Sequence, residues 1–178
     1  MNQSINEAMK QSLLRLNELP AAHATREFLK CCGSQLWAQK MGGMRPFASV
    51  AELLSTAERV WWSLSETDWR EAFRAHPRIG EKKAATAQSA EAERWSAREQ
   101  SGVEHAAAET ISELAERNRE YEQRFGFIFI VCATGKSSDE MLAIIKGRMQ
   151  NDAETELRAA AEEQRKITGL RIRKLLNE

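Results

Sequence analysis

Residues 73–80 read Phe73-Arg74-Ala75-His76-Pro77-Arg78-Ile79-Gly80, and the rest of the chain is organised around them. Trp69, Phe73 and His76 lie at positions i, i+4 and i+7, which share one face of a helix. Pro77 ends that helix, because proline lacks an N–H and disfavours the helical conformation in the residue before it. The sequence therefore predicts that His76 lies in the last turn of a helix, on the side of the core residues.

A histidine in that position has two interpretations. It can be a core residue whose ring nitrogens are hydrogen-bonded, which is the commoner case, or a positioned acid or base. The position of His76 alone does not decide between these two interpretations, so the other segments of the chain must be considered.

Length and composition predict one domain, residues 1–178, with an all-α fold. The chain has 178 residues, of which 42% are hydrophobic, and it contains only 9 glycines and 3 prolines. Helix-forming Ala, Glu, Arg and Leu are abundant. Because 26 Lys and Arg balance 26 Asp and Glu, neither a nucleic acid nor an anionic membrane is expected to be the main partner.

The cysteines and the N-terminus predict a cytoplasmic protein. Cys31, Cys32 and Cys132 are odd in number and form no CxxC pair, as expected in a reducing compartment. The three histidines are scattered, which does not suggest a zinc site. Charged residues interrupt the segment 1–19, so it holds no signal-peptide core, and no apolar run approaches the ~18–20 residues that span a bilayer.

Several helices can be placed by apolar spacing and capping residues. Ser49-Val50-Ala51-Glu52 is a capping-box pattern, Ser137 to Glu140 cap a further helix, and Asn151 with Glu154 box the start of the last one. Residues 81–100 are polar and fit a solvated helix or a mobile loop. Other helices are expected at 5–19, 21–32, 34–41 and 104–124, and in the segment that leads to His76.

One buried extended stretch is expected within the bundle, at Phe125-Gly126-Phe127-Ile128-Phe129-Ile130-Val131-Cys132-Ala133. It is aromatic and β-branched, and the helical surroundings offer it no obvious sheet partner. Its backbone N–H and C=O groups must nevertheless be satisfied. Loops or a lone hairpin can do this, and so can a polar ligand.

The last helix carries an arginine in its apolar stripe. Arg171 follows the helical spacing of Ala153, Leu157, Ala160, Gln164, Ile167 and Leu175. A buried guanidinium needs an anion, which either an internal carboxylate or a ligand can supply. Glu99 is a further candidate for proton transfer, although Ser96-x-x-Glu99 also fits a capping box. Together with His76 these features indicate a helical protein with a small-anion pocket, and they do not name a reaction.

Five motifs in register resemble the OHCU decarboxylases, where OHCU is 2-oxo-4-hydroxy-4-carboxy-5-ureidoimidazoline, an intermediate of urate breakdown. They are Arg45-Pro46-Phe47-Ala48-Ser49, His76-Pro77-Arg78-Ile79-Gly80, Ser96-x-x-Glu99-Gln100, Asn118-x-x-Tyr121-x-x-Arg124-Phe125-Gly126-Phe127-x-Phe129-Ile130 and Leu170-Arg171-Ile172. The resemblance implies a cofactor-free, all-α, homodimeric enzyme that makes (S)-allantoin. An enzyme of the same fold acting on another ureido or imidazole acid, and a non-enzymatic helical interaction protein, are the alternatives.

The resemblance also implies residue roles. His76 would be the catalytic acid or base, and Glu99 would be its partner at the reacting centre. Substrate would be bound by Pro77, Ser96, Gln100 and Arg171 and by the backbone of Phe129, Ile130, Val131, Cys132 and Ala133. Two segments depart from the family pattern: Ile128 stands where many relatives have proline, and Arg78-Ile79-Gly80-Glu81 replaces Asp-Leu-Ala-Gly.

Overall fold

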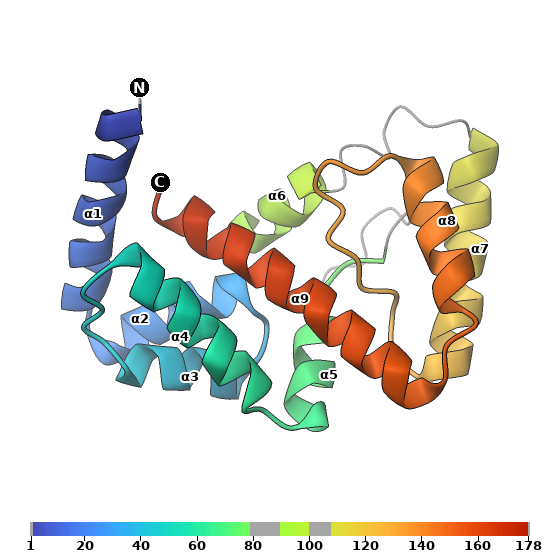
Figure 1. Cartoon of the computed structure of the whole chain (residues 1–178), viewed down its shortest axis with the longest axis horizontal. Helices are drawn as coiled ribbons and strands as arrows, with labels where there is room; N and C mark the ends of the chain where they lie inside the picture. The colour runs from blue at the N-terminus through green and yellow to red at the C-terminus, as the bar shows by residue number, and fades with distance from the viewer. Residues whose placement is uncertain (1, 79–89, 100–107, 178) are drawn as a thin grey trace. The chain divides into compact units, whose positions relative to one another are not determined.

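A computed structural model describes residues 2–78, 90–99 and 108–177, and within these ranges the regular structure is helical (Figure 1). The all-α prediction is thus confirmed. The helices are α1 (Asn2–Glu18), α2 (Ala21–Cys31), α3 (Gln35–Gly43), α4 (Val50–Trp62), α5 (Glu66–Arg74), α6 (Ala90–Glu99), α7 (Ala108–Phe125), α8 (Ser138–Arg148) and α9 (Ala153–Leu175). None of the helices in the described part of the chain has the length and hydropathy to cross a membrane.

The chain forms two compact units, which are described separately. Unit 1 comprises residues 1–69 and 165–178, and unit 2 comprises residues 70–164. α9 contributes its first half to unit 2 and its second half to unit 1.

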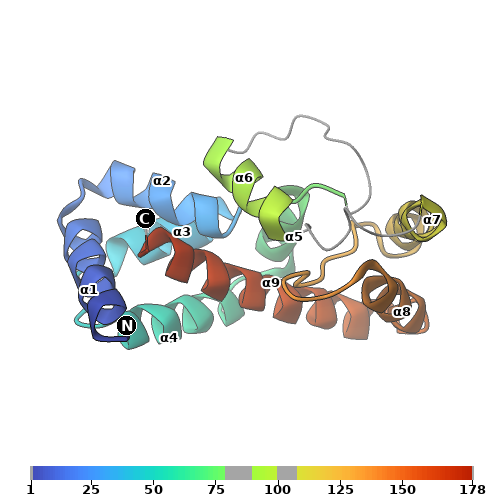
Figure 2. The same cartoon turned by 90° about the horizontal axis from the view of Figure 1, so that it is seen from above.

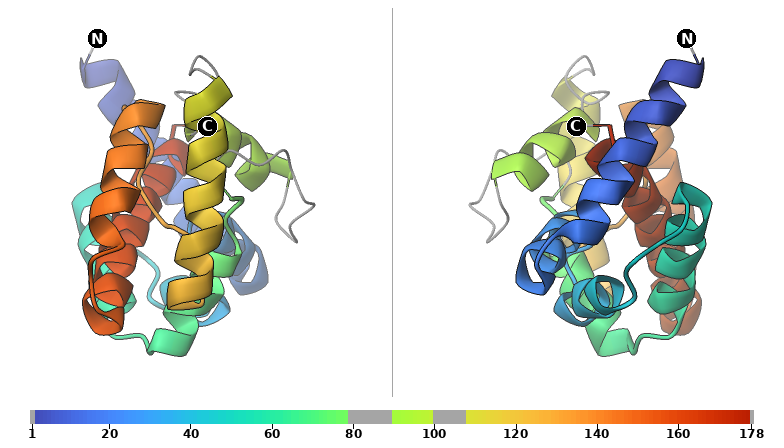
Figure 3. Two further views of the ribbon diagram at one scale, coloured as in Figure 1. Left: turned by 90° about the vertical axis from the view of Figure 1, so that its right-hand side faces the viewer. Right: turned by 90° about the vertical axis from the view of Figure 1, so that its left-hand side faces the viewer.

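Unit 1 packs α2 against α3, α3 against α4 and α1 against α4 (Figure 3, right). Its core is aromatic: the Phe28 ring meets the Trp37 ring edge-on with 5.9 Å between centroids. Arg45 explains the first family motif, because its Nη1 donates to the carbonyls of Leu16, Asn17 and Leu19 at 2.8, 3.0 and 2.7 Å. The guanidinium thereby satisfies carbonyls that a helix C-terminus leaves without intrahelical partners.

Unit 2 explains why an extended stretch follows α7. α7 and α8 pack side by side and run in the same direction (Figures 1 and 3), so the chain must return along α7 before α8 can start. Eighteen helical residues span about 27 Å. A connection of a dozen residues covers that length only if it is extended. The same parallel pair is seen end-on in Figure 2.

A buried polar network holds the extended stretch in place. Tyr121 lies within contact of the Phe125, Phe127 and Phe129 rings and donates its hydroxyl hydrogen to Glu156. The fully buried Glu156 carboxylate pairs with Arg148, whose Nη1 donates to the Ile130 carbonyl at 2.6 Å. Burial raises the pKa of the Tyr121 hydroxyl well above its usual value, so Tyr121 stays a hydrogen-bond donor.

Two helix ends differ from the sequence-based expectation. α5 ends at Arg74 rather than at His76, because the next two amides bond three residues back, Ala75 to Ala72 and His76 to Phe73 (3.2 and 3.1 Å). This tighter 3₁₀ ending is the conformation that Pro77 permits. α9 is capped by Asp152, which accepts from the Thr155 amide at 2.8 Å.

The predicted Asn151–Glu154 box is therefore wrong. Asn151 turns inward, where its Nδ2 donates to Glu156 Oε2 at 2.7 Å. The Ser137–Glu140 box is present in full. At α4 only half of the predicted box forms: Ser49 accepts from the Glu52 amide, whereas the Glu52 carboxylate accepts from the Ala48 amide.

Candidate functional site

His76 is fixed by a buried amide of α9. Its Nε2 lies 2.7 Å from Oε1 of Gln164, and both residues belong to unit 2. Gln164 has no exposed surface, whereas His76 is half-buried. A buried amide oxygen is costly to leave without a hydrogen bond. This pair therefore fixes the orientation of the imidazole, and the half-buried ring keeps access to a small molecule.

The predicted stretch 125–133 is buried and non-helical only in part, because Phe125 ends α7 and Gly126 is exposed, whereas residues 129–133 are buried. Several backbone groups of residues 129–133 are bonded to side chains. Residues 129–133 are between 2% and 8% exposed. The Cys132 amide donates to Glu163 Oε2 at 2.7 Å, and the Cys132 carbonyl accepts from Lys136 Nζ at 2.7 Å. Side chains of this chain thus provide hydrogen-bond partners for part of this backbone. The sequence had left loops, a hairpin or a ligand as the possible partners.

Glu99 and Ser96 lie on α6, three residues apart and therefore on one face of the helix. Ser96 is 3% exposed and Glu99 is half-buried. Because α6 begins at Ala90, Ser96 is inside the helix and cannot cap its start. The capping-box interpretation of Ser96 and Glu99 is thus wrong, and Glu99 stays a candidate for chemistry.

Glu99 also acts on the extended stretch. Burial raises the pKa of the Cys132 thiol, and the nearby charges contribute: Lys136 opposes the shift, while Glu163 and Glu99 add to it. His76 contacts Gln164 of α9, and Cys132 contacts the preceding residue, Glu163. The Glu99 carboxylate acts electrostatically on Cys132. Unit 2 thus holds both proposed catalytic side chains and the stretch 129–133.

Arg171 lies in unit 1 and has no exposed surface. Its charge acts on the buried Cys31 thiol of α2, whose pKa is raised strongly by burial, with the guanidinium opposing that shift. Leu157, Ala160, Ile167 and Gln164 are buried on the same helix, whereas Ala153 is exposed. The prediction that Arg171 belongs to the buried stripe of α9 is confirmed.

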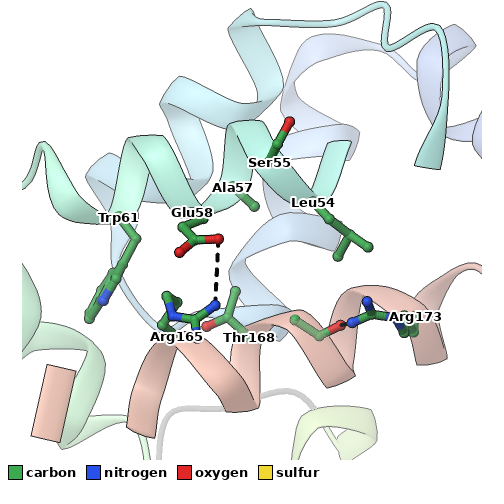
Figure 4. A pocket seen from close by; sticks show the side chains of 9 residues that line it. Leu54, Ser55, Ala57, Glu58, Trp61, Arg165, Thr168 and Arg173 are labelled. Carbon is green, nitrogen blue, oxygen red and sulfur yellow. Dashed lines mark hydrogen bonds and ion pairs between the residues drawn. The ribbon is translucent and has the colours of Figure 1, made fainter. Parts of the chain in front are cut away.

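Two surface hollows are lined by none of His76, Glu99 and Arg171, and one of them includes Val131 of the extended stretch. In unit 1 a hollow of about 250 Å³ lies between α4 and α9, where Arg165 reaches across to Glu58 at 3.5 Å (Figure 4). In unit 2 a hollow of about 200 Å³ is lined by Val131, Lys136, Arg148 and Glu163, among others. Among the described residues, no group of three or more His, Cys, Asp or Glu side chains could hold a metal ion. Gln100 lies outside the described residues.

A family model for OHCU decarboxylase matches residues 17–173. The chain belongs to the OHCU decarboxylase family. The matched range includes His76, Glu99, Arg171 and the stretch 129–133.

Similarity to individual proteins and structures supports the same family assignment. The chain is 40% identical over 153 residues to the uric acid degradation bifunctional protein TTL of Arabidopsis thaliana, covering 85% of this chain and 47% of that protein, about half its length. It is 33% identical to the 2-oxo-4-hydroxy-4-carboxy-5-ureidoimidazoline decarboxylase of Haloferax volcanii, covering 76% of this chain and 77% of that protein. A crystal structure of OHCU decarboxylase in the presence of (S)-allantoin superposes with a TM-score of 0.74 at 39% identity, covering 86% of this chain and 99% of that one.

Gln164 and Glu163 are two residues of this region whose contacts the sequence does not predict. Gln164 carried a signal, because it stands in the apolar stripe of the last helix in the same way as Arg171. Glu163 shows no such sequence signal, since a glutamate next to an apolar stripe is normally solvated. Only the folded backbone shows that it meets the Cys132 amide.

Proposed function

We propose that this chain catalyses the cofactor-independent decarboxylation of OHCU to (S)-allantoin, as a step of urate catabolism. The family match over residues 17–173 supports the reaction class. The observation that carries the mechanism is the 2.7 Å contact that fixes His76 on Gln164, since a proton-transfer group must be held in a defined orientation.

The substrate itself supplies the electron sink. Its carboxylate is on a carbon adjacent to a ring C=N bond. When the C–CO₂ bond breaks, its electron pair forms a C=C bond and the C=N pair moves to nitrogen, which takes a proton. The resulting enol loses its hydroxyl proton as the C=O forms, while the neighbouring ring carbon takes a proton. In total one CO₂ leaves and one proton is consumed, so no external electron sink is needed.

The residues would divide the work as follows. His76 exchanges the proton of the hydroxyl group, and Glu99 polarises the imidazole or relays a proton. Arg171 binds an anionic or carbonyl group of the substrate, for which its planar guanidinium is suited. Pro77, Ser96, Gln100 and the backbone of 129–133 complete the pocket. Proton delivery to one face of the ring sets the S configuration.

The direct test follows optical activity. OHCU is generated freshly from urate with the two enzymes that precede this step, and circular dichroism records (S)-allantoin with and without the protein. We expect clear acceleration with the wild-type chain. His76→Asn is expected to lower kcat by about 10²- to 10⁴-fold, the usual contribution of a general acid or base. Spontaneous rates with the wild-type protein would exclude the proposal.

The same assay addresses the alternative substrate class. If OHCU decays at its spontaneous rate but another ureido or imidazole carboxylic acid is decarboxylated, the chain is an enzyme of the same fold with a different substrate. We further propose a homodimer, which the family resemblance supports, and a cytoplasmic location, which the unpaired pattern of the cysteines supports. Light scattering during size-exclusion chromatography should give twice the chain mass of 20.2 kDa, and a single-chain mass would contradict the dimer.

A further inference from the structure

We infer that Gln164 is the positioning residue of His76: it holds the imidazole with its hydrogen on Nε2 and so makes Nδ1 the nitrogen that exchanges a proton with the substrate. The inference rests on the proposed decarboxylation for the role of His76. Its structural part, the state of the ring, can be tested without any turnover.

The contact between His76 and Gln164 has a defined donor and a defined acceptor. Gln164 presents its carbonyl oxygen, Oε1, to His76 Nε2 at 2.7 Å. A carbonyl oxygen only accepts hydrogen bonds, so Nε2 must carry the hydrogen. A neutral imidazole has one N–H, and its basic lone pair is then on Nδ1. Which nitrogen of a histidine acts is commonly set by the hydrogen bond of the other one.

The Gln164 side chain is a rigid acceptor. Gln164 has no exposed surface and lies between the fully buried Ala161 and the 5% exposed Ile167 on the inner face of α9. A fully buried side chain in a close-packed interior has little freedom to change rotamer. Water cannot replace the amide where no surface is exposed. The ring of His76 is thus held by a stiff element rather than by a loop.

Glu163, the residue before Gln164, holds the extended stretch. Glu163 accepts the hydrogen of the Cys132 amide at 2.7 Å, so two consecutive residues of α9 hold His76 and the extended stretch. Their spacing on one helical turn fixes the distance between the proposed acid or base and the backbone expected to face the substrate. Active sites need such supporting contacts to keep reacting groups within fractions of an ångström.

The experiment begins with nitrogen-15 NMR of the full-length protein without ligand. A hydrogen-bonded Nε2–H exchanges slowly with water and gives its own correlation, which His76→Asn assigns by its disappearance. We expect this signal in the wild-type chain and in Gln164→Glu, whose carboxylate is also an acceptor. We expect its loss in Gln164→Met, which has similar length and no comparable acceptor. Absence of the signal in the wild type, or its persistence in Gln164→Met, would overturn the inference.

Kinetics then separate positioning from folding. Gln164→Met should lower kcat and kcat/KM together by about 10- to 100-fold, as loss of a supporting contact does, with KM unchanged. Thr56→Val is the control: it removes another buried hydrogen-bonding group, the hydroxyl that accepts from Arg59 at 3.3 Å, and should keep the wild-type rate. Loss of the NMR signal with a wild-type kcat would refute the positioning role.

The two proposals fail in different ways. If His76→Asn decarboxylates OHCU at the wild-type rate, the assigned role of His76 is wrong, while the NMR result still reports on the ring. If His76→Asn is inactive and Gln164→Met is fully active, the proposed function stands and the inference about Gln164 is refuted.

Discussion

Glu156, Gln164 and Arg171 are three polar side chains that α9 buries completely. Each would destabilise the fold if it were left unsatisfied, so each demands a partner. Glu156 has one in Arg148 and Gln164 has one in His76. Arg171 acts electrostatically on the Cys31 thiol, and we also assign it to substrate binding, because its planar guanidinium matches the geometry of a planar anion.

Arg171→Lys tests this assignment, since it keeps the charge and removes the planar fork. We expect kcat/KM for OHCU to fall about 10- to 100-fold, in line with the ~1.5–3 kcal/mol that a hydrogen bond to a charged group contributes. Arg165→Lys is the matched control on the same helix, because its 3.5 Å pair with Glu58 is partly exposed and should matter little. Equal rates for both variants would argue against a role of Arg171 in binding.

Cys31 gives a pH dependence with a definite sign. Burial raises the pKa of its thiol above the ordinary value of 9.0. The thiol of the unfolded chain therefore ionises first, so stability is fully present below pH ~9 and declines as pH rises further. Urea unfolding between pH 7 and 10 should show this decline, and Cys31→Ala should show a shallower one. An identical slope in the variant would contradict the assignment.

At the scale of elements, the segment between α7 and α8 is extended because those helices run in the same direction. Its position depends on α8 and α9, through the bond of Arg148 to the Ile130 carbonyl and that of Glu163 to the Cys132 amide. Side chains of neighbouring helices thus hold the stretch. They take the place of a partner strand, which the helical sequence around the stretch does not predict.

Glu156→Gln should destabilise the protein by about 3–5 kcal/mol, because removing one partner of a buried ion pair leaves the Arg148 charge uncompensated. Urea unfolding followed by far-UV circular dichroism measures the loss. Glu154→Gln, an exposed position in the first turn of the same helix, should stay within about 0.5 kcal/mol of the wild type. A loss below 1 kcal/mol in Glu156→Gln would show that the network contributes little.

At the scale of the whole molecule, the family match extends over residues of both units. Ligand binding should therefore be visible in the unfolding of the full chain. A product present at 100 times its Kd should add about 2.7 kcal/mol to the free energy of unfolding. We expect (S)-allantoin to raise Tm measurably, (R)-allantoin to raise it less, and Arg171→Met to lose the effect. Equal shifts with both enantiomers would contradict a stereospecific site.

The features that can be predicted from the sequence alone are local ones. Apolar spacing placed the helices, Ser137 and Glu140 capped α8, and Arg171 was assigned to a buried stripe, because periodicity and capping depend on residues a few positions apart. The ordered motifs indicated the family, and family membership is confirmed. Errors occurred where a distant partner competed with a local one: Asn151 serves the buried Glu156, and Asp152 caps α9 instead.

The contacts that hold His76 and the extended stretch are visible only in the folded chain. Gln164 and His76 are 88 positions apart, and Glu163 and Cys132 are 31 apart, so no local pattern could pair them. The same structure removed the capping interpretation of Ser96 and Glu99 by starting α6 at Ala90. Hydrogen bonds across such separations depend on how helices pack, and helix packing is a property of the folded chain rather than of any segment of it.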